Sequence, residues 1–402
     1  MAGRTIQRMP IYLDHAATTP LRGEVLAAMM PFFTESFGNP SSAHGFGRAA
    51  RAGLDEAHEK LAAQLHAEPR EVVFTSGGTE ANNLALKGAA WASKARGHRI
   101  VTSSVEHHAV GHTLRYLEKF GFEVVELPVD RYGRVDPNQL EAALTDRTIL
   151  VSIMAANNEV GTIQPLTDIA ARVRTRRDIL FHVDAVQAAP YIDLDMRELD
   201  ADLVSLGAHK FEGPKGVGAL FVRHGTHILA QQHGGSQERH RRAGTENVAG
   251  AVGLATAYEL TCAERPATVT RLSTYRQRLT DRILEVEGTE LTGHPTERLP
   301  GLLSIIGRGT DGNAVSLSLD LEGIATSVGS ACTTGSTEVS HVLTAMGFPE
   351  DEARGALRLS LGRTTSEEDV ATAAEVVPRV IASMRVGSAA VAADPLGQGV
   401  SV

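Results

Sequence analysis

Three short clusters contain residue types that could together hold one organic cofactor. The first, residues 75–83 (TSGGTEANN), is a Gly-rich turn between an apolar run and a helix-compatible stretch. Backbone N–H groups in such a turn, with the positive end of the helix dipole, bind a phosphate, and Thr79 can add its hydroxyl. The turn lacks the Lys-Ser/Thr ending of a nucleoside-triphosphate loop and the spacing of a dinucleotide fingerprint. A bound phosphate would therefore belong to another cofactor, although a Gly-Gly turn alone is more often only a turn.

The second and third clusters each follow a strongly apolar run. Asp184 lies in residues 182–187 (HVDAVQ), and a carboxylate removed from water there needs a cation or hydrogen-bond donors. A protonated ring nitrogen would serve, but an exposed helix cap is an equally good use of Asp184. Lys210 stands among small residues before a Gly/Pro turn, where desolvation lowers a lysine pKa and favours Schiff-base chemistry. Most lysines, however, are solvated surface charges.

Taken together, the three clusters match the requirements of pyridoxal 5'-phosphate. That cofactor needs an anion cradle for its phosphate, a carboxylate that keeps its pyridine nitrogen protonated, and a lysine that holds its aldehyde. The Gly-rich turn, Asp184 and Lys210 occur in that order along the chain. The combination is far more specific than any one member, so the sequence predicts a pyridoxal phosphate enzyme.

The elements that must position these clusters form an α/β pattern. Between residues 71 and 223, short β-rich runs alternate with helix-compatible stretches, which indicates a mostly parallel sheet covered by helices. Ligands of such sheets bind beyond the carboxyl ends of the strands, where the three clusters fall. We expect seven strands in this sheet, at residues 71–75, 99–103, 123–127, 149–154, 179–183, 203–206 and 217–222.

The chain is long enough for more than one domain. Its 402 residues exceed the ~100–200 that are usual for one domain, and the pattern changes near residues 255–262 to a long helical segment followed by shorter strands. We predict a large cofactor-binding domain at 15–258. A smaller α+β domain would consist of residues 1–14 plus 259–386, and residues 387–402 would form a flexible tail.

Composition excludes several classes of protein and partner. The sequence is 42% apolar and 22% charged, as in ordinary soluble globular proteins. A net charge of −9 argues against nucleic acid or an anionic membrane as a direct partner. We expect neither a membrane span nor a secretory signal. With only Cys262 and Cys332, a disulfide framework is excluded and a reducing, cytoplasmic compartment is expected.

Eight motifs resemble one family in the same order, and the resemblance runs from about residue 11 to residue 365. The motifs are LDHAATT (13–19), FGNPSS (37–42), EH (106–107), NNEVG (157–161), HVDAVQ (182–187), HK (209–210), RAGTEN (242–247) and GSACT (329–333). They resemble the cysteine desulfurases of the iron–sulfur cluster assembly type, which are pyridoxal phosphate enzymes of the class V aminotransferase superfamily with the type I fold.

The resemblance implies a role around the cofactor ring for five residues. Lys210 would bind the aldehyde of the cofactor, and Asp184 would pair with the pyridine nitrogen. Gln187 would hydrogen-bond the phenolic oxygen, and Asn158 would help to orient the ring and the substrate. His107 would stack on the ring and take part in catalysis by moving protons.

The resemblance also implies contacts at the phosphate and at the substrate. Thr79 and His209 would contact the phosphate, and Thr245 would reach it from a neighbouring subunit, which implies a homodimer with shared active sites. Asn39 and Arg358 would hold the carboxylate of L-cysteine, a planar and bidentate task that suits a guanidinium.

Two glycines near the expected phosphate site differ from the pattern of relatives. Most relatives have a serine where this chain has Gly207, so one phosphate-binding hydroxyl is missing and weaker cofactor retention is expected. Gly78 replaces the alanine of some relatives and is expected to fit the tight turn of the phosphate cradle equally well.

Cys332 is the candidate nucleophile. It lies in a segment, 326–337, that is rich in Gly, Ser and Thr and has few apolar anchors, so we expect this segment to be exposed and mobile. The resemblance implies that the Cys332 thiolate attacks the sulfur of L-cysteine, which leaves a persulfide on Cys332 and releases L-alanine. A neighbouring base such as His107 would favour the thiolate. Cys262 lies in an apolar run and is expected to be inert.

A mobile segment would let the same sulfur meet the cofactor and then an acceptor protein, such as an iron–sulfur scaffold. Other interpretations stay open at this point: a selenocysteine lyase, β-lyase or aminotransferase of the same fold, or a non-catalytic interaction protein that retains it. His107 and His108 with His112 include an i, i+4 pair, but no carboxylate or cysteine stands at ligand spacing, so no metal site is expected.

Overall fold

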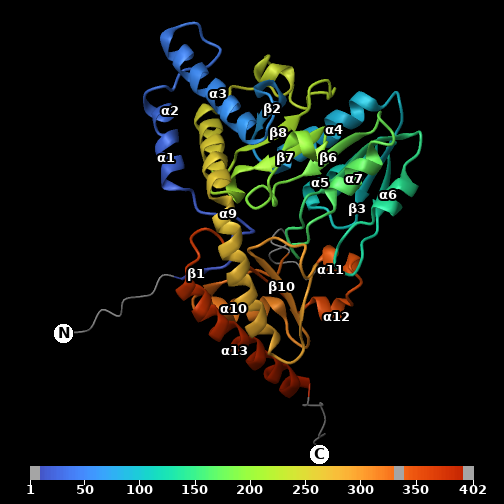
Figure 1. Cartoon of the computed structure of the whole chain (residues 1–402), viewed down its shortest axis with the longest axis vertical. Helices are drawn as coiled ribbons and strands as arrows, with labels where there is room; N and C mark the ends of the chain where they lie inside the picture. The colour runs from blue at the N-terminus through green and yellow to red at the C-terminus, as the bar shows by residue number, and fades with distance from the viewer. Residues whose placement is uncertain (1–9, 330–338, 393–402) are drawn as a thin grey trace, which may run out of the picture.

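A seven-stranded sheet forms the centre of the larger part of the molecule (Figure 1). The computed structural model describes residues 10–329 and 339–392, with only the backbone for 386–392. Strand β8 is antiparallel to both of its neighbours, and every other neighbouring pair is parallel. The strands, in sheet order, are β2 (Val72–Thr75), β8 (Gly218–Val222), β7 (Leu203–Gly207), β6 (Leu180–Asp184), β5 (Thr148–Met154), β3 (Arg99–Ser103) and β4 (Glu123–Leu127).

The predicted α/β class and all seven predicted strands are confirmed, and each strand begins and ends within one residue of its predicted bounds. The central strands are buried on both faces, which is why they appear in the sequence as continuous apolar runs. Successive side chains along a strand point to opposite faces of the sheet and pack into two different hydrophobic cores. Ile100 packs under helices α4 (Gly78–Ser93) and α5 (His108–Glu118), whereas Val101 faces the opposite core.

The opposite face of the sheet is covered by helices from several parts of the chain. Their packed side chains belong to one continuous core with the sheet. The helices that contribute to this core are α1 (Gly23–Met29), α3 (Gly45–Gln64), α6 (Pro137–Ala143), α7 (Leu166–Val173), α8 (Met196–Leu199) and the first half of α9 (Val248–Leu284). The short helix α2 (Pro31–Thr34) lies between α1 and α3. Residues 37–42 lie in the loop that connects α2 to α3.

A smaller sheet with its own core forms the rest of the molecule. Strands β9 (Thr289–Leu291), β10 (Leu302–Gly307) and β12 (Ala356–Ser360) are antiparallel, with β10 in the middle. Beside them, β1 (Ile11–Tyr12) pairs in parallel with β11 (Ile324–Ala325). The accompanying helices are α10 (Gly312–Leu321), α11 (His341–Ala345), α12 (Glu350–Ala353) and α13 (Glu367–Ala392).

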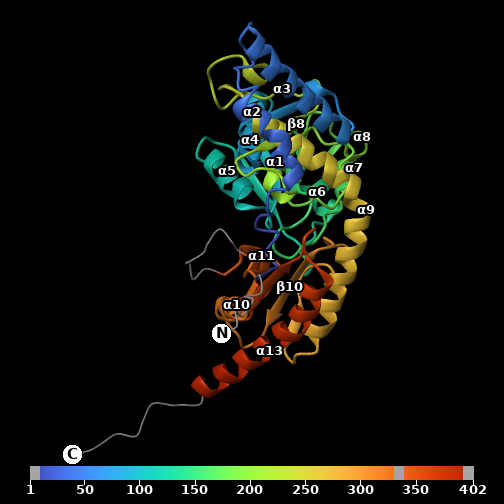
Figure 2. The same cartoon turned by 90° about the vertical axis from the view of Figure 1, so that its left-hand side faces the viewer.

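Helix α9 runs through both parts, down the length of the molecule in Figure 1 and along one side of it in Figure 2. Its first half packs against α3 and its second half against α13. The predicted boundary near residue 258 falls inside this helix and stays a prediction. Helix α13 continues to Ala392, so 387–392 are helical where a tail was expected, because its alanines favour a helix. Residues 393–402 lie outside the described residues.

Gly218 marks the point where β8 passes closest to the turn that follows β2. It pairs with Thr75 on β2 and with Gly207 on β7. A Cβ at this position would lie 2.5 Å from the backbone carbon of Gly77 and 2.7 Å from the carbonyl oxygen of Leu206. The missing side chain therefore lets the Gly-rich turn lie directly against the sheet.

Replacing this glycine tests that close approach. Gly218→Ala is expected to lower the free energy of unfolding by about 1–3 kcal/mol, because the added methyl group meets backbone atoms that cannot rotate away. Gly111→Ala is the control: it lies in α5 with no atom within 4 Å of the added Cβ, and alanine should stabilise the helix by roughly 0.5–1 kcal/mol. Urea unfolding followed by circular dichroism measures both. Equal stability of Gly218→Ala and the wild type would contradict the tight approach.

Candidate active site

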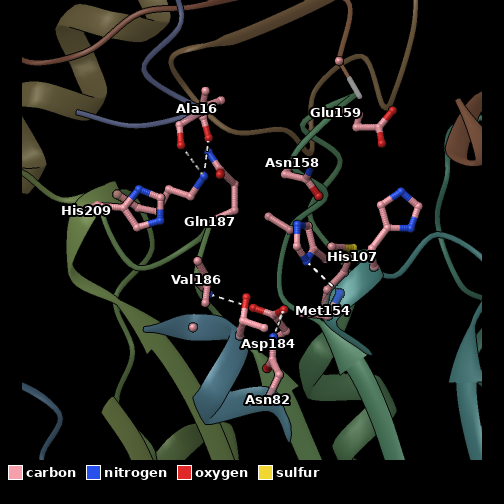
Figure 3. Close-up of a pocket in the computed structure, with 18 of the residues that line it drawn as sticks. Ala16, Asn82, His107, Met154, Asn158, Glu159, Asp184, Val186, Gln187 and His209 are labelled. Atoms are coloured by element: carbon pink, nitrogen blue, oxygen red, sulfur yellow. Dashed lines mark hydrogen bonds between the residues drawn. The ribbon is translucent and has the colours of Figure 1, made fainter. Parts of the chain in front are cut away.

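A cavity of about 260 Å³ lies beyond the carboxyl ends of β5, β6 and β7, where both parts of the molecule contribute to its walls. Figure 3 shows side chains from opposite walls directed into this space. It brings together nine of the predicted site residues, which are far apart in the sequence: Gly78, Thr79, His107, Asn158, Asp184, Gln187, His209, Lys210 and Arg358.

Asp184, the last residue of β6, is buried in the floor of this cavity. Its Oδ2 accepts a hydrogen bond from Asn82 Nδ2 at 2.6 Å, and its Oδ1 accepts one from the Val186 N–H at 3.0 Å. These donors offset the cost of removing the carboxylate from water. The alternative of an exposed helix cap is therefore wrong. Asn82 was missed as a site residue, and its signal was a polar side chain on the otherwise apolar buried stripe of α4.

His182, two residues earlier on β6, ties three strands together beneath Asp184. Its Nδ1 lies 2.9 Å from Ser152 Oγ on β5, and its Nε2 lies 3.0 Å from Ser205 Oγ on β7. Complete burial lowers the pKa of His182 to about 3, so the ring is neutral at physiological pH. The two serines satisfy both ring nitrogens and fix the strand end that carries Asp184.

Lys210 lies in the cavity wall and not in bulk solvent. It follows β7 in the short 3-10 helix Ala208–Lys210, and its Nζ donates hydrogen bonds to the carbonyl oxygens of Ala16 at 2.5 Å and Ala17 at 2.9 Å. The same segment holds the neighbouring residue, because Thr18 Oγ1 lies 3.2 Å from His209 Nδ1. The hypothesis of a solvated surface lysine is therefore wrong.

His107 and His209 are both neutral at physiological pH. Burial lowers the pKa of His107, although the negative charge of Asp184 opposes this effect. Burial and the nearby Lys210 lower the pKa of His209 to about 4. His107 precedes α5, and its Nδ1 accepts the N–H of Ala109 at 3.1 Å, which leaves Nε2 to carry the proton of the neutral ring. A neutral imidazole can both give and accept a proton, as acid–base work requires.

Glu106, the residue before His107, is buried and links the ends of two strands. Its Oε1 accepts hydrogen bonds from Ser103 Oγ at 2.6 Å and from the Met154 N–H at 2.9 Å, which joins the ends of β3 and β5. Burial raises the pKa of Glu106 to about 8, so this carboxyl group is protonated at pH 7. Its structural role was not predicted, because it depends on partners from a strand far along the chain.

The phosphate cradle is formed by the start of α4 and the end of β7. Gly77 has a φ of +152°, and a Cβ on Gly78 would lie 2.6 Å from Val186 Cγ2, so both positions suit glycine. A Cβ on Gly207 would lie 3.5 Å from the Gly78 amide nitrogen. A serine there would thus stand beside the cradle, whereas Gly207 leaves the backbone and Thr79 to bind an anion. The weaker cofactor retention expected from Gly207 stays a prediction.

The remaining cavity wall fits the ring of pyridoxal phosphate. Gln187 Oε1 and Asn82 Oδ1 are buried and have no hydrogen-bond partner within the described part of the chain. Buried amides of this kind are normally satisfied, so a ligand that offers a donor to Gln187 would remove an energetic cost. The carboxylate of Asp184, the amine of Lys210 and the glycine cradle supply the other three contacts that this cofactor needs.

Arg358, on β12, forms the opposite wall and is only 2% exposed. Its Nη2 donates to Asp14 Oδ1 at 2.8 Å. Its Nη1 donates to the carbonyl oxygens of Asn158 at 2.9 Å and Gly329 at 3.0 Å. The guanidinium is therefore fixed at the cavity by contacts from three other segments of the chain.

Two predicted site residues do not line the cavity, and a third lies outside the described residues. Asn39 and Thr245 are exposed and lie outside it. The Oδ1 of Asn39 accepts the N–H of Ser41 at 2.9 Å within its own loop, and its expected contact with the substrate stays a prediction. Cys332 falls in 330–338, outside the described residues.

The other cysteine, Cys262, is partly buried in α9. Its Sγ accepts a hydrogen bond from Arg265 Nη2 at 3.0 Å, and burial raises the pKa of its thiol. A thiol that is hard to deprotonate is a poor nucleophile, which agrees with the inert role expected for Cys262. Across residues 10–329 and 339–392, no group of three or more His, Cys, Asp or Glu side chains is arranged to hold a metal ion.

The hydrogen bond from Asn82 to Asp184 gives a direct test of the cavity floor. Asn82→Ala is expected to weaken pyridoxal phosphate binding roughly 10- to 100-fold, because a hydrogen bond to a charged group is lost where water cannot replace it. Fluorescence titration of the cofactor-free protein measures this affinity. Asn83→Ala is the control, since Asn83 donates to the Thr79 carbonyl on the same helix and not to Asp184. Equal weakening by both changes would show only a loosened helix.

Comparisons with known proteins agree with this geometry. The class-V aminotransferase family model matches residues 11–372. The chain is 49% identical over 375 residues to a cysteine desulfurase IscS of Methanosarcina thermophila, covering 93% of each chain. It is 48% identical to a cysteine desulfurase IscS of Dictyoglomus turgidum, covering 93% of this chain and 95% of the relative.

Solved structures show the same similarity. A NifS-like protein superposes with a TM-score of 0.88 at 38% identity, covering 93% of this chain and all of the other. A structure described as SspA in complex with cysteine superposes with a TM-score of 0.78 at 35% identity, covering 87% and 98%. With a cavity that fits pyridoxal phosphate, this chain belongs to the class V aminotransferase family and, within it, to the pyridoxal phosphate-dependent cysteine desulfurases.

Proposed function

We propose that this chain converts L-cysteine to L-alanine, places the sulfur on Cys332 as a persulfide, and supplies it to iron–sulfur cluster assembly or another thiolation pathway. The observation that carries this proposal is the position of Lys210, whose amine lies in one cavity with Asp184, His107 and Arg358. The similarity to relatives named cysteine desulfurase IscS supports the choice of reaction.

Pyridoxal phosphate, when bound, supplies an electron-withdrawing ring that stabilises negative charge at the substrate Cα. In our proposal Asp184 keeps the ring nitrogen protonated, and Gln187 hydrogen-bonds the phenolic oxygen. Lys210 removes the Cα proton, since its amine is the basic group held beside the cavity. His107, neutral and with its proton on Nε2, moves protons at the opposite wall.

Arg358 binds the substrate carboxylate in this proposal, and Asn158 borders both the ring and the substrate. Sulfur transfer then requires the thiolate of Cys332. An S–S bond forms between Cys332 and the substrate sulfur while the C–S bond of cysteine breaks. The electron pair of that bond passes to Cβ, which is protonated. Lys210 then returns a proton to Cα, which gives L-alanine. No external oxidant or reductant is needed, because the sulfur leaves at the oxidation level of a persulfide.

A second copy of this chain is the partner that we propose for the surface near α1. The segment from α1 to the start of α3 carries five exposed large apolar side chains, among which the rings of Phe37 and Phe46 lie 5.4 Å apart. Such clusters usually mark interfaces. The exposed residues are Leu26, Met30, Phe33, Phe37 and Phe46.

A homodimer would also explain why Thr245 is exposed, since the partner could use it at the phosphate. Asn39 could likewise contact substrate only through such an assembly.

We propose an iron–sulfur scaffold as the sulfur acceptor and the cytoplasm as the compartment. Among the described helices, none combines the length and the apolar character needed to cross a bilayer.

The two cysteines allow a matched test of the persulfide. Cys332→Ser is expected to lower alanine formation from L-cysteine at least about a hundredfold, because the nucleophile is lost while the visible absorption of the bound cofactor remains. Mass spectrometry after brief exposure to L-cysteine should find one added sulfur on the peptide that contains residue 332 in the wild type and in Cys262→Ser, and none in Cys332→Ser. Cys262→Ser is the control and should keep full turnover. Undiminished alanine formation by Cys332→Ser would refute the persulfide mechanism.

A further inference from the structure

Asp14 is the acidic partner of the buried guanidinium of Arg358. The two side chains form an ion pair of 2.8 Å between Asp14 Oδ1 and Arg358 Nη2. A guanidinium has five N–H donors, and here the Asn158 and Gly329 carbonyls take two and Asp14 takes a third. Arg358 Nε is buried and has no partner within the described part of the chain. Asp14 is therefore the charged group that contacts the guanidinium of Arg358 and helps to set the rotation of its plane.

Asp14 is itself held rigidly by the backbone around it. It follows β1, which pairs in register with β11, and it forms an isolated parallel bridge with Ser360 of β12. The hydroxyl of Tyr12 donates to the Asp14 carbonyl at 3.0 Å. Because β12 also carries Arg358, the backbone next to the carboxylate pairs with the strand that carries the guanidinium. This pairing fixes the position of Asp14 relative to Arg358, in addition to the neutralisation of charge.

The same short segment reaches the other end of the cavity. Two and three residues after Asp14, the carbonyl oxygens of Ala16 and Ala17 accept hydrogen bonds from Lys210 Nζ. One stretch of four residues thus contacts the group proposed to bind the substrate carboxylate and the amine proposed to act at Cα. An α-amino acid has its carboxylate and amine on adjacent atoms, so the spacing of their two binding groups must be held closely.

We propose that Asp14 is a positioning residue for the substrate carboxylate. Its Oδ1 holds the guanidinium of Arg358 in the rotation that matches a carboxylate whose amino group is directed towards the cofactor. The proposal rests on the proposed role of Arg358. The proposal requires that the position of the Asp14 oxygen affects substrate binding more than the negative charge of Asp14 does. A residue that only neutralised the charge of Arg358 would show the opposite.

Two substitutions of Asp14 separate place from charge. Asp14→Asn keeps the acceptor oxygen in position and removes the charge, whereas Asp14→Glu keeps the charge and moves the oxygen by one methylene group. Each is made in holoenzyme that also carries Cys332→Ser, so that binding is observed without sulfur transfer. Dissociation constants are measured from the change in cofactor absorbance with L-cysteine and with cysteamine, which has the same thiol and amine but no carboxylate.

We expect Asp14→Glu to weaken L-cysteine binding at least about tenfold, because a displacement near 1 Å disturbs a bidentate contact, and Asp14→Asn to weaken it less than about threefold. Cysteamine binding should change less than about twofold in both. Asp193→Asn, which alters an Asp–Arg pair elsewhere at 2.8 Å to Arg265, should change neither ligand. If Asp14→Glu does not fold, Asp14→Ala replaces it in the same comparison.

The outcomes distinguish this proposal from the proposed function. Arg358→Gln should weaken L-cysteine and spare cysteamine; if it does not, Arg358 does not bind the carboxylate and both assignments fall together. If Arg358→Gln behaves as expected but Asp14→Asn weakens binding more than Asp14→Glu, Asp14 is only a counter-ion and the positioning role is overturned. Tighter binding of L-cysteine to Asp14→Glu would overturn it as well, because Asp14 would then be competing with the substrate.

Discussion

The buried carboxylate at the end of β6 is the constraint on which the rest of this structure depends. An ionised Asp184 can remain in the floor of the cavity only because Asn82 and the Val186 N–H donate to it. Asn82 lies on α4, so the same contact places the start of that helix and its glycine turn. One hydrogen bond between α4 and β6 therefore links the glycine turn to the carboxylate that we propose for the cofactor ring.

The strands and the chemistry-bearing clusters could be predicted because both are local. Strands such as β5 and β7 are buried throughout and mostly apolar, and the clusters around Gly78, Asp184 and Lys210 each lie next to the strand that carries them. Convergence at one edge then follows from the rule that ligands bind beyond the carboxyl ends of parallel strands. The nature of the fold and most of the cavity wall are thus contained in short stretches of sequence.

What could not be predicted depends on contacts between distant segments. Asp14 and Arg358 are 344 positions apart, and nothing near either residue indicates the other. Asn82, Glu106 and His182 look like ordinary polar residues until neighbouring strands supply their partners. Asn39 was assigned by resemblance alone, and such an assignment does not say which chain of an assembly the residue serves.

The pairing of the first strand with a late one has a consequence for biosynthesis. Strand β1 joins β11, and Asp14 joins Arg358, so the cavity wall that contains Arg358 cannot form until 344 further residues have been made. At about 5–20 residues per second, a ribosome needs roughly 20–70 s for that length. The central sheet is complete much earlier, since β8 ends at Val222. Under the proposed role of Arg358, a nascent chain therefore presents its lysine well before it can recognise an amino acid, and it becomes able to bind substrate only when translation is nearly finished.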